Sequence, residues 1–266
     1  AQGRFQADLS SVRGIVTMGS PFERADCIKV QETLTPNIFN GYGTTETFWN
    51  TFLRPYDLPE MSGTAGSSCT DDEVRIVKVR EEGRSEPDEL AAKDGVEVGE
   101  VIIRTPKSSY SYFKNEEEEK NKFYKGWLYT GDLGTWDKNQ YITIAGRKDD
   151  MIISGGENIY PPIIEEVLNE HPKVHQSAVA GVPDSLRGEA VVAYIVPEDD
   201  SLTVGEIAKF CVQSPMLSTF KRPRYYKFVK ELPMTATGKL QHYLVKEMAI
   251  NDLELGMLKL AIADVD

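Results

Sequence analysis

Two glycines, two hydroxyl side chains and one carboxylate lie together in the stretch Gly41-Tyr42-Gly43-Thr44-Thr45-Glu46 of the 266-residue chain. Glycine lets the backbone approach a ligand closely, and threonine hydroxyls can donate hydrogen bonds to phosphate oxygens. A single carboxylate is a common ligand for Mg²⁺ that phosphates already carry. The stretch therefore indicates a phosphate-binding loop. The alternative interpretation is a polar turn with a helix cap at Thr44 or Thr45.

Two further stretches have residues that suit a nucleotide. In the segment W-L-Y-T-G-D-L, residues 127–133, Asp132 can accept two hydrogen bonds from the vicinal hydroxyls of a ribose. Lys239 ends a loop of small residues that begins at Pro233, and a lysine is a mobile point charge suited to a phosphate or a developing oxyanion. The alternatives are an ordinary turn aspartate and one more surface lysine.

A glycine pair, Gly155-Gly156, follows the charged run R-K-D-D at residues 147–150. Adjacent glycines permit a tight loop or leave room for a narrow ligand arm. The alternative is a polar linker followed by a hairpin turn.

Several other catalytic patterns are absent from the sequence. It has no G-x-x-x-x-G-K-[ST] loop, no G-x-G-x-x-G, no G-x-S-x-G and no H-E-x-x-H. His171 and His175 have the spacing of a metal pair, but Pro172 argues against one continuous helix and no third ligand is evident. We therefore interpret them as turn or surface histidines.

Taken in order, the motifs Y-G-T-T-E, Y-T-G-D-L, G-R-K-D-D-M-I-I-S-G-G-E-N-I-Y-P and P-M-T-A-T-G-K resemble those of the adenylate-forming superfamily. The resemblance runs from about Gly14 to Met248. The form S-G-G-E-N-I-Y-P is similar to the acyl- and aryl-CoA ligase branch. The resemblance implies an AMP-forming acid–CoA ligase. Such an enzyme uses Mg²⁺ and ATP to convert a carboxylic acid to an acyl-adenylate, from which coenzyme A displaces AMP.

Matched residue by residue, the resemblance implies a role for each motif. Tyr42 is similar to the aromatic that stacks on adenine, Thr45 to a phosphate-binding residue and Glu46 to the magnesium carboxylate. Asp132 is similar to the acid that binds both ribose hydroxyls, with Arg147 as a second ribose or phosphate contact. The implied nucleotide-binding residues are Gly41, Tyr42, Gly43, Thr45, Asp132 and Arg147.

The remaining implied roles belong to the second half of the chain. Lys239 is similar to the lysine that bridges the carboxylate and the α-phosphate, so the implied catalytic residues are Lys239, Glu46 and Thr45. Asp149 falls at the family's hinge position. The implied coenzyme A contacts are Gly155, Gly156, Lys221 and Arg222, and for the basic turn at Lys221 and Arg222 the alternative is a solvated surface.

The resemblance also implies a mixed α/β and α+β fold. We expect residues 1–146 to be the strand-rich end of a large N-terminal AMP-binding domain and residues 147–150 to be a hinge. Residues 151–250 would be a complete small α+β domain, and residues 251–266 a tail. The family's Ser/Thr/Gly-rich loop upstream of Y-G-T-T-E has no counterpart here, so we expect a fragment with little adenylation activity of its own.

Two other functions stay open. One is a non-catalytic module of the same fold that binds a nucleotide or coenzyme A, and the other is a luciferase-like or carrier-loading enzyme. The acid itself is not identified, since Phe48, Trp49 and Phe52 suit either an apolar acyl pocket or a core.

Periodicity predicts the elements that would position these residues. Strands are expected at 14–19, 74–79, 100–104 and 141–144, and a helix at 22–34. Beyond residue 146, a helix beginning near Pro162 and one after Thr203, with Glu206 completing a capping box, should pack on strands at 177–182, 190–196 and 225–229. A last helix follows Lys239, and Glu116–Glu119 should face solvent on a helix.

Charge and composition exclude several partners. Lys plus Arg number 30 and Asp plus Glu 42, and the resulting net charge of −12 disfavours nucleic acid. The longest apolar run, 190–196, is far shorter than the ~20 residues that span a bilayer, so no integral membrane segment is expected. Three widely spaced cysteines favour a cytoplasmic protein without disulfides.

Overall fold

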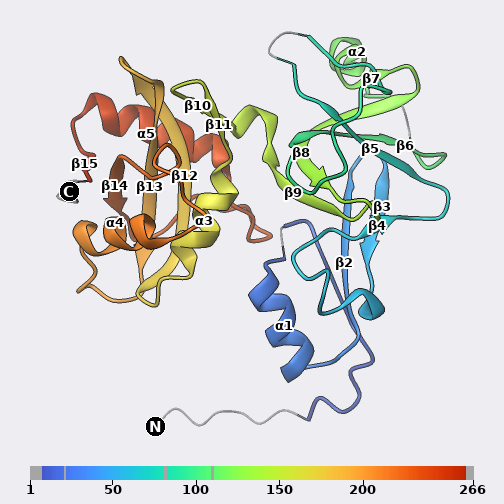
Figure 1. The fold of residues 1–266 in the computed structure, drawn as a ribbon, viewed down its shortest axis with the longest axis horizontal. Coiled ribbons are helices and arrows are strands. Elements are labelled where there is room, and N and C mark those ends of the chain that lie inside the picture. The colour runs from blue at the N-terminus through green and yellow to red at the C-terminus, as the bar shows by residue number, and fades with distance from the viewer. Residues whose placement is uncertain (1–7, 21, 81–82, 109–110, 262–266) are drawn as a thin grey trace. The chain divides into compact units, whose positions relative to one another are not determined.

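The computed structural model describes residues 8–20, 22–80, 83–108 and 111–261. The chain separates into two compact units, Ala1–Ile144 and Ala145–Asp266, each with its own sheets and core (Figure 1). The mixed α/β composition expected from the sequence is confirmed. Among the described residues, every helix is too short or too polar to cross a bilayer.

The first unit begins with a four-stranded sheet in the order β1-β2-β3-β4. Its elements are β1 (Ile15–Met18), α1 (Arg24–Thr33), β2 (Ile38–Thr44), β3 (Phe48–Leu53) and β4 (Ser67–Ser68). Because α1 carries the chain back across the sheet, β1 and β2 are parallel, whereas β2 and β3 form an antiparallel hairpin. Cys27, Ile38 and Leu53 are fully buried between α1 and this sheet.

A second sheet of the same unit has the order β5-β6-β8-β7, with β9 paired to β8. Its strands are β5 (Glu73–Lys78), β6 (Gly99–Arg104), β7 (Phe123–Tyr124), β8 (Trp127–Trp136) and β9 (Ile142–Arg147), and β9 crosses the boundary between the two units. Alternating residues fill both faces: Ile76 and Val101 lie in one cluster, and Val77 and Ile102 in another. A short 3₁₀ turn, η1, spans Pro55–Asp57.

Helix α2 (Glu116–Lys122) buries none of its residues, which confirms the predicted solvent-facing helix. Asn115 caps it by accepting a hydrogen bond from the Glu118 amide. The four glutamates of its first turn are favourably placed at the positive end of the helix dipole.

The second unit is a six-stranded sheet in the order β11-β10-β13-β14-β15, with β12 paired to β13. Its strands are β10 (Ile152–Ser154), β11 (Glu157–Ile159), β12 (Val174–Asp184), β13 (Gly188–Pro197), β14 (Tyr225–Phe228) and β15 (Lys259–Leu260). Its helical elements are η2 (Lys148–Asp150), α3 (Pro161–Asn169), α4 (Val204–Gln213) and α5 (His242–Glu254). The end of α5 and all of β15 lie past residue 250, within the expected tail.

Helices α3 and α4 cover one face of the second unit's sheet and α5 covers the other (Figure 1). The alternation along β13 explains this arrangement: Val191, Ala193 and Ile195 pack on one side, whereas Ala190, Val192 and Tyr194 pack on the other. Both faces of a central strand are therefore buried, which accounts for the continuous apolar run.

The start of α4 differs in one detail from the predicted capping box. The Thr203 hydroxyl accepts a hydrogen bond from the Glu206 amide at 3.2 Å, as expected. The Glu206 carboxylate does not complete the box; it lies 3.0 Å from Lys173 and 3.8 Å from His171 instead. Only the Thr203 half of the capping box is therefore formed, because the Glu206 carboxylate contacts the segment between α3 and β12 instead of the start of the helix.

Candidate functional site

The stretch Gly41–Glu46 forms the end of β2 and the turn into β3. Gly43 has no room for a side chain, since a Cβ there would lie 1.6 Å from the Phe48 carbonyl oxygen. The Thr44 hydroxyl lies 3.0 Å from the Thr47 hydroxyl across the turn. The helix-cap alternative is therefore wrong, because both threonines belong to a hairpin, and the Thr45 side chain stands exposed at its tip.

Asp132 lies in the bulged centre of β8 and not in a turn. The register of β6 and β8 shifts between Glu100 and Ile102, and Gly131 adopts a φ of +75° directly before the aspartate. The Asp132 Oδ2 atom accepts a hydrogen bond from the Tyr42 hydroxyl at 2.7 Å. An aromatic ring and a carboxylate that are 90 residues apart in sequence are thus held side by side.

Glu46 is half-buried and is held by a residue that the sequence did not point to. The Tyr112 hydroxyl donates to Glu46 Oε1 at 2.5 Å. Burial raises the pKa of Glu46, but hydrogen bonds from Tyr112 and Thr44 outweigh that effect and leave the pKa below its ordinary value. The carboxylate is therefore kept ionised. Tyr112 lies among serines and aromatics before α2, where no motif distinguishes it.

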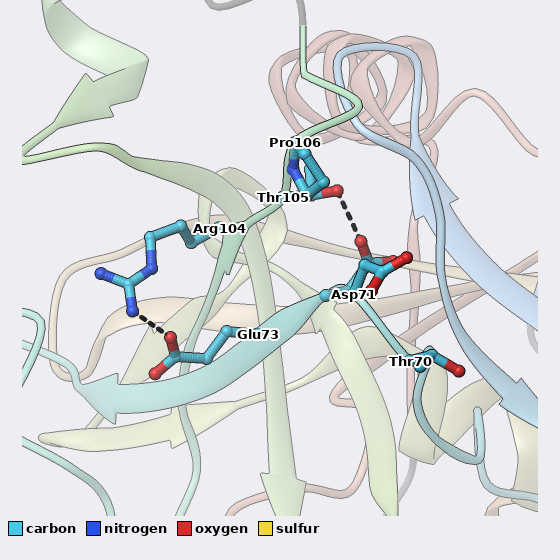
Figure 2. A pocket seen from close by; sticks show the side chains of 7 residues that line it. Thr70, Asp71, Glu73, Arg104, Thr105 and Pro106 are labelled. Carbon is cyan, nitrogen blue, oxygen red and sulfur yellow. Dashed lines mark hydrogen bonds and ion pairs between the residues drawn. The ribbon is translucent and has the colours of Figure 1, made fainter.

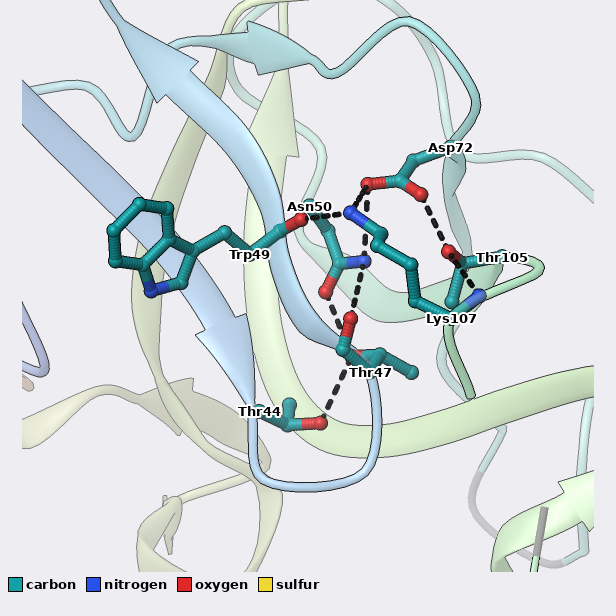
Figure 3. Close-up of polar contacts among 7 residues, drawn as sticks. All are labelled: Thr44, Thr47, Trp49, Asn50, Asp72, Thr105 and Lys107. Atoms are coloured by element: carbon teal, nitrogen blue, oxygen red, sulfur yellow. Dashed lines mark hydrogen bonds and ion pairs between the residues drawn. The ribbon is translucent and has the colours of Figure 1, made fainter. Parts of the chain in front are cut away.

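A buried polar network also anchors the hairpin (Figure 3). Tyr42 pairs with Thr51 and Gly43 with Trp49, so Asn50 is the extra residue of a bulge and its side chain points inward. Asn50 accepts from the Thr47 hydroxyl at 2.7 Å and donates to Asp72 Oδ2 at 3.2 Å.

Asp72 is the centre of this network. Its side chain is 0% exposed, and Lys107 Nζ lies 2.6 Å from Oδ2. The Thr105 hydroxyl donates to Oδ1, and Lys107 also donates to the Trp49 carbonyl oxygen. Because the acceptor Asp72 directly precedes β5 and the donors Thr105 and Lys107 follow β6, the network ties the hairpin to the second sheet of the first unit.

An open surface hollow of about 480 Å³ lies beside Asp72 (Figure 2). Thr70, Asp71 and Glu73 line one side, and Arg104 pairs with Glu73 across it. Its charged groups include two acids besides Asp72, so its character differs from that of an anion-binding site.

Two aromatic side chains on β3 are exposed. Phe48 is 65% and Trp49 38% exposed, with their rings stacked at a centroid distance of 5.6 Å. Phe52 is half-buried and meets Trp49 edge-on at 5.2 Å. For Phe48 and Trp49 the core alternative is wrong, since neither is buried.

In the second unit, the glycine pair forms the two-residue turn between β10 and β11. Gly155 and Gly156 have φ values of +62° and +84°, a combination that favours glycine at both positions of a tight hairpin turn. The Gly155 amide donates to the Arg187 carbonyl oxygen at 2.8 Å. The hairpin turn of the alternative interpretation is therefore present, with both glycines exposed.

The hinge candidate Asp149 is exposed in the middle of η2, directly after Arg147 and Lys148. Its neighbour Asp150 is half-buried, and burial raises the pKa of Asp150 even though His242 and Arg147 oppose that change. The turn thus presents one solvated and one sheltered carboxylate.

Lys239 lies on a tight loop between β14 and α5. Its amide donates to the Thr235 hydroxyl at 3.0 Å, and the Gly238 amide donates to the Thr235 carbonyl oxygen at 2.9 Å. Met234 and Leu240 pair across the base of this loop. The backbone is therefore well defined while the lysine side chain is exposed.

The basic turn after α4 has internal contacts. Arg222 donates to the carbonyl oxygens of Leu217 and Val212 at 3.2 and 3.4 Å, and Arg224 pairs with Asp184 at 3.3 Å. Arg222 therefore stabilises the C-terminal end of α4, whatever its part in ligand binding.

The two histidines have different surroundings. His171 lies in the turn after α3, is 6% exposed and packs edge-on against Phe210, whereas His175 is exposed beside Glu198. No group of three His, Cys, Asp or Glu suited to a metal occurs among the described residues.

Two family models match the chain. The model of the AMP-binding enzyme matches residues 1–113, and that of the AMP-binding enzyme C-terminal domain matches residues 163–239. The chain belongs to the AMP-binding enzyme family. The first match includes the β2–β3 hairpin and Tyr112, and the C-terminal match ends at Lys239.

Curated and solved relatives agree with this assignment. A long-chain-fatty-acid–CoA ligase from Yersinia pestis is 34% identical over 94% of this chain and 42% of its own length. The o-succinylbenzoate CoA synthetase of Bacillus subtilis, in complex with its acyl-adenylate intermediate, superposes with a TM-score of 0.78 and 32% identity over 89% of this chain and 46% of that one. The amide bond synthetase McbA of Marinactinospora thermotolerans has a TM-score of 0.79 and 30% identity over 92% and 48%. The chain spans less than half the length of each of these relatives.

Asp132, Arg147, Asp149 and the glycine pair lie between the two matched ranges of the family models. The support for a role of these residues therefore comes from the geometry of the unit in which each of them lies.

Proposed function

We propose that the protein to which this chain belongs is an AMP-forming acid–CoA ligase. In the first step a carboxylate oxygen attacks the α-phosphorus of ATP, and the bond to the pyrophosphate oxygen breaks. In the second step the thiolate of coenzyme A attacks the acyl carbon, and AMP leaves with the bonding electrons. The products are an acyl-CoA thioester, AMP and pyrophosphate.

The observation that carries this proposal is the pairing of Tyr42 with Asp132. A nucleoside presents a flat base and a vicinal diol a short distance apart, so a site needs an aromatic face and a carboxylate held next to each other. The 2.7 Å hydrogen bond between the Tyr42 hydroxyl and Asp132 Oδ2 holds this combination across two sheets. We assign Tyr42 to the adenine and Asp132 to the ribose, with Arg147 as a second contact.

The residues present fit a magnesium ion carried by the phosphates. Mg²⁺ takes hard oxygen ligands and is often bound through one or two carboxylates plus substrate phosphates. Glu46 supplies such a carboxylate, kept ionised by its hydrogen bonds, and the neighbouring residue Thr45 is exposed. When bound, the ion would offset negative charge on the phosphates; Glu46 would hold it, while Thr45 and the glycines 41 and 43 would bind phosphate oxygens.

Lys239 is our candidate for the charge that the first step needs. The attacking carboxylate and the α-phosphate repel each other, so a cation between them stabilises the transition state. The exposure of Lys239 on a defined loop of small residues supports such a role. Asp149 in η2 would be the hinge on which the second unit moves between the two steps.

The coenzyme A half of the site belongs to the second unit. The exposed Gly155-Gly156 turn offers backbone without side chains beside a narrow pantetheine arm. Lys221 and Arg222 would meet the nucleotide phosphates of coenzyme A.

The exposed Phe48–Trp49 pair supports an acid with an apolar chain or ring. The free thiols of Cys27, Cys69 and Cys211 support a reducing compartment such as the cytoplasm.

A substrate panel on the full-length protein tests the proposal. AMP release is measured with aliphatic, branched and aryl acids, each with and without coenzyme A. We expect ATP-dependent AMP release with at least one acid and a thioester product only when coenzyme A is present. One solved relative is an amide bond synthetase. If an added amine gave an amide product, the acceptor of the acyl group would instead be an amine and not coenzyme A.

Lys239→Ala should separate the two steps. Loss of one transition-state charge typically costs ~10²–10³ in rate, so adenylation should fall by about that factor. Thioester formation from supplied acyl-AMP should persist, because the second step does not use the lysine. Equal loss of both steps would contradict this role; Lys209→Ala, at an exposed position of α4, is the matched control.

A further inference from the structure

The hairpin that carries Thr45 and Glu46 is held by residues from the segment after β6. We propose that Tyr112 is a positioning residue that orients the Glu46 carboxylate toward the metal–nucleotide, while Lys107 and Asp72 brace the same hairpin. This inference rests on the proposed function, in which Glu46 binds the magnesium ion of Mg·ATP.

The contact between Tyr112 and Glu46 is specific in direction. The Tyr112 hydroxyl donates to Oε1, and the Thr44 side chain also hydrogen-bonds to the carboxylate. A glutamate on a hairpin turn has three rotatable side-chain bonds, so an unheld carboxylate must lose rotamer freedom when it binds a cation. Tyr112 makes that loss part of folding, which is the usual benefit of a preorganised ligand.

Tyr112 is itself held in place. Its ring lies 5.9 Å from that of Phe123 at a tilt of 43°, and Phe123 is the first residue of β7. The hydroxyl donor is thus mounted on the second sheet of the first unit, not on the hairpin that it orients. A movement of the hairpin away from this sheet would break the hydrogen bond.

A second set of contacts, centred on Asp72, braces the hairpin. Asp72 is a fully buried carboxylate, and such a charge persists only when it is paired and hydrogen-bonded. Its partners are Lys107, Thr105 and Asn50, and Lys107 continues to the Trp49 carbonyl oxygen on the hairpin itself. Lys107 therefore holds the backbone of the hairpin, whereas Tyr112, together with Thr44, holds the Glu46 carboxylate.

Nucleotide binding to the full-length protein tests Tyr112 without any turnover. Binding of ATP is measured by titration calorimetry with Mg²⁺ and, separately, with EDTA, in the absence of an acid. Tyr112→Phe removes one hydroxyl that donates to a charged group, so we expect the Kd for Mg·ATP to rise about tenfold. The Kd for metal-free ATP should stay within about twofold.

Two variants complete the experiment. Tyr141→Phe is the matched control, because it removes another tyrosine–carboxylate hydrogen bond, to Asp57 at 2.6 Å, and should change neither Kd. Glu46→Gln should raise the Kd for Mg·ATP more than Tyr112→Phe does.

The outcomes separate the inference from the function on which it rests. The positioning role of Tyr112 would be overturned if Tyr112→Phe left the Kd for Mg·ATP unchanged, or if it raised the Kd for metal-free ATP by the same factor. A metal-dependent effect of Glu46→Gln could still be present in either case. If Glu46→Gln itself has no metal-dependent effect, the magnesium role of Glu46 fails, and the inference fails with it.

Discussion

His242 is a sheltered imidazole at the first position of α5, and carboxylates from two other elements face it. Its side chain is 22% exposed, and its Nδ1 atom lies 3.7 Å from Glu165 of α3 without a hydrogen-bond partner among the described residues. Burial lowers the pKa of His242, and the charge of Asp150 in η2 opposes this only in part. Arg147, Asp149 and Lys246 also act on the Asp150 side of the cluster, so the folded unit favours a neutral imidazole.

This sheltering predicts a pH dependence of stability at the residue scale. An unfolded histidine titrates near pH 6.5, whereas the lowered pKa keeps the folded imidazole neutral, so acidification favours the unfolded chain. Urea unfolding of the chain should show a lower free energy at pH 5.5 than at pH 7.5, with a His242 contribution of at most about 1.4 kcal/mol per pH unit. His242→Gln should remove that contribution.

His175→Gln provides the comparison, because it removes a histidine whose side chain is 65% exposed and leaves the sheltered cluster around His242 intact. The raised pKa of Asp150 works in the opposite sense, because a contribution from its protonated form is lost as the pH rises. Identical profiles for the original chain and His242→Gln would show that another group is responsible.

At the scale of elements, the β2–β3 hairpin depends on the buried network around Asp72. Asp72→Ala would leave Lys107, Thr105 and Asn50 without their shared acceptor. Breaking a buried pair costs about 3–5 kcal/mol, but the Lys107 side chain is 38% exposed and solvent recovers part of this. We expect the free energy of unfolding to fall by about 2 kcal/mol in urea denaturation.

Asp71→Ala is the matched comparison for this network. Asp71 is the exposed neighbour that lines the surface hollow, and a substitution there should change stability by less than about 0.5 kcal/mol. A similar loss in both variants would mean that the network adds nothing beyond local turn structure.

Elements with a strong period were predictable, and those defined by long-range pairing were not. Alternation along 190–196 and the apolar face after Pro162 predicted β13 and α3, because burial on a sheet or helix face dictates that spacing. Nothing in the spacing showed that Tyr42 would meet Asp132 or that Tyr112 would meet Glu46, since each contact joins separate sheets or loops. The site residues were indicated by motif resemblance, and their supporting shell appeared only with the fold.

At the scale of the whole molecule, the two steps of the proposed reaction use different parts of the second unit, the Lys239 loop in the first step and the Gly155-Gly156 turn in the second. The Lys239 loop precedes α5, whereas the Gly155-Gly156 turn joins β10 to β11. The Lys239 loop and the Gly155-Gly156 turn belong to one compact unit. Motion of that unit as a rigid body would therefore be the simplest way to replace one of them by the other at the substrate between the two steps.

Asp149→Pro in the full-length protein tests that motion. Proline fixes φ and disfavours helical geometry at Lys148, so η2 should lose its freedom to rotate. Adenylation, measured as ATP–pyrophosphate exchange, should be retained, whereas thioester formation should slow about tenfold or more. Asp149→Ala keeps the backbone freedom and should spare both steps; equal loss of both steps in the proline variant would remove Asp149 as the hinge.

The exposed ring of Trp49 has a practical consequence for spectroscopy. Trp127 and Trp136 are 3% and 2% exposed, so among the three tryptophans only Trp49 is open to a quencher such as acrylamide. Trp49 lies three residues after Glu46, on the strand that follows the turn. Its emission therefore provides a built-in optical signal at the hairpin, by which occupancy of the neighbouring turn can be followed without an attached dye.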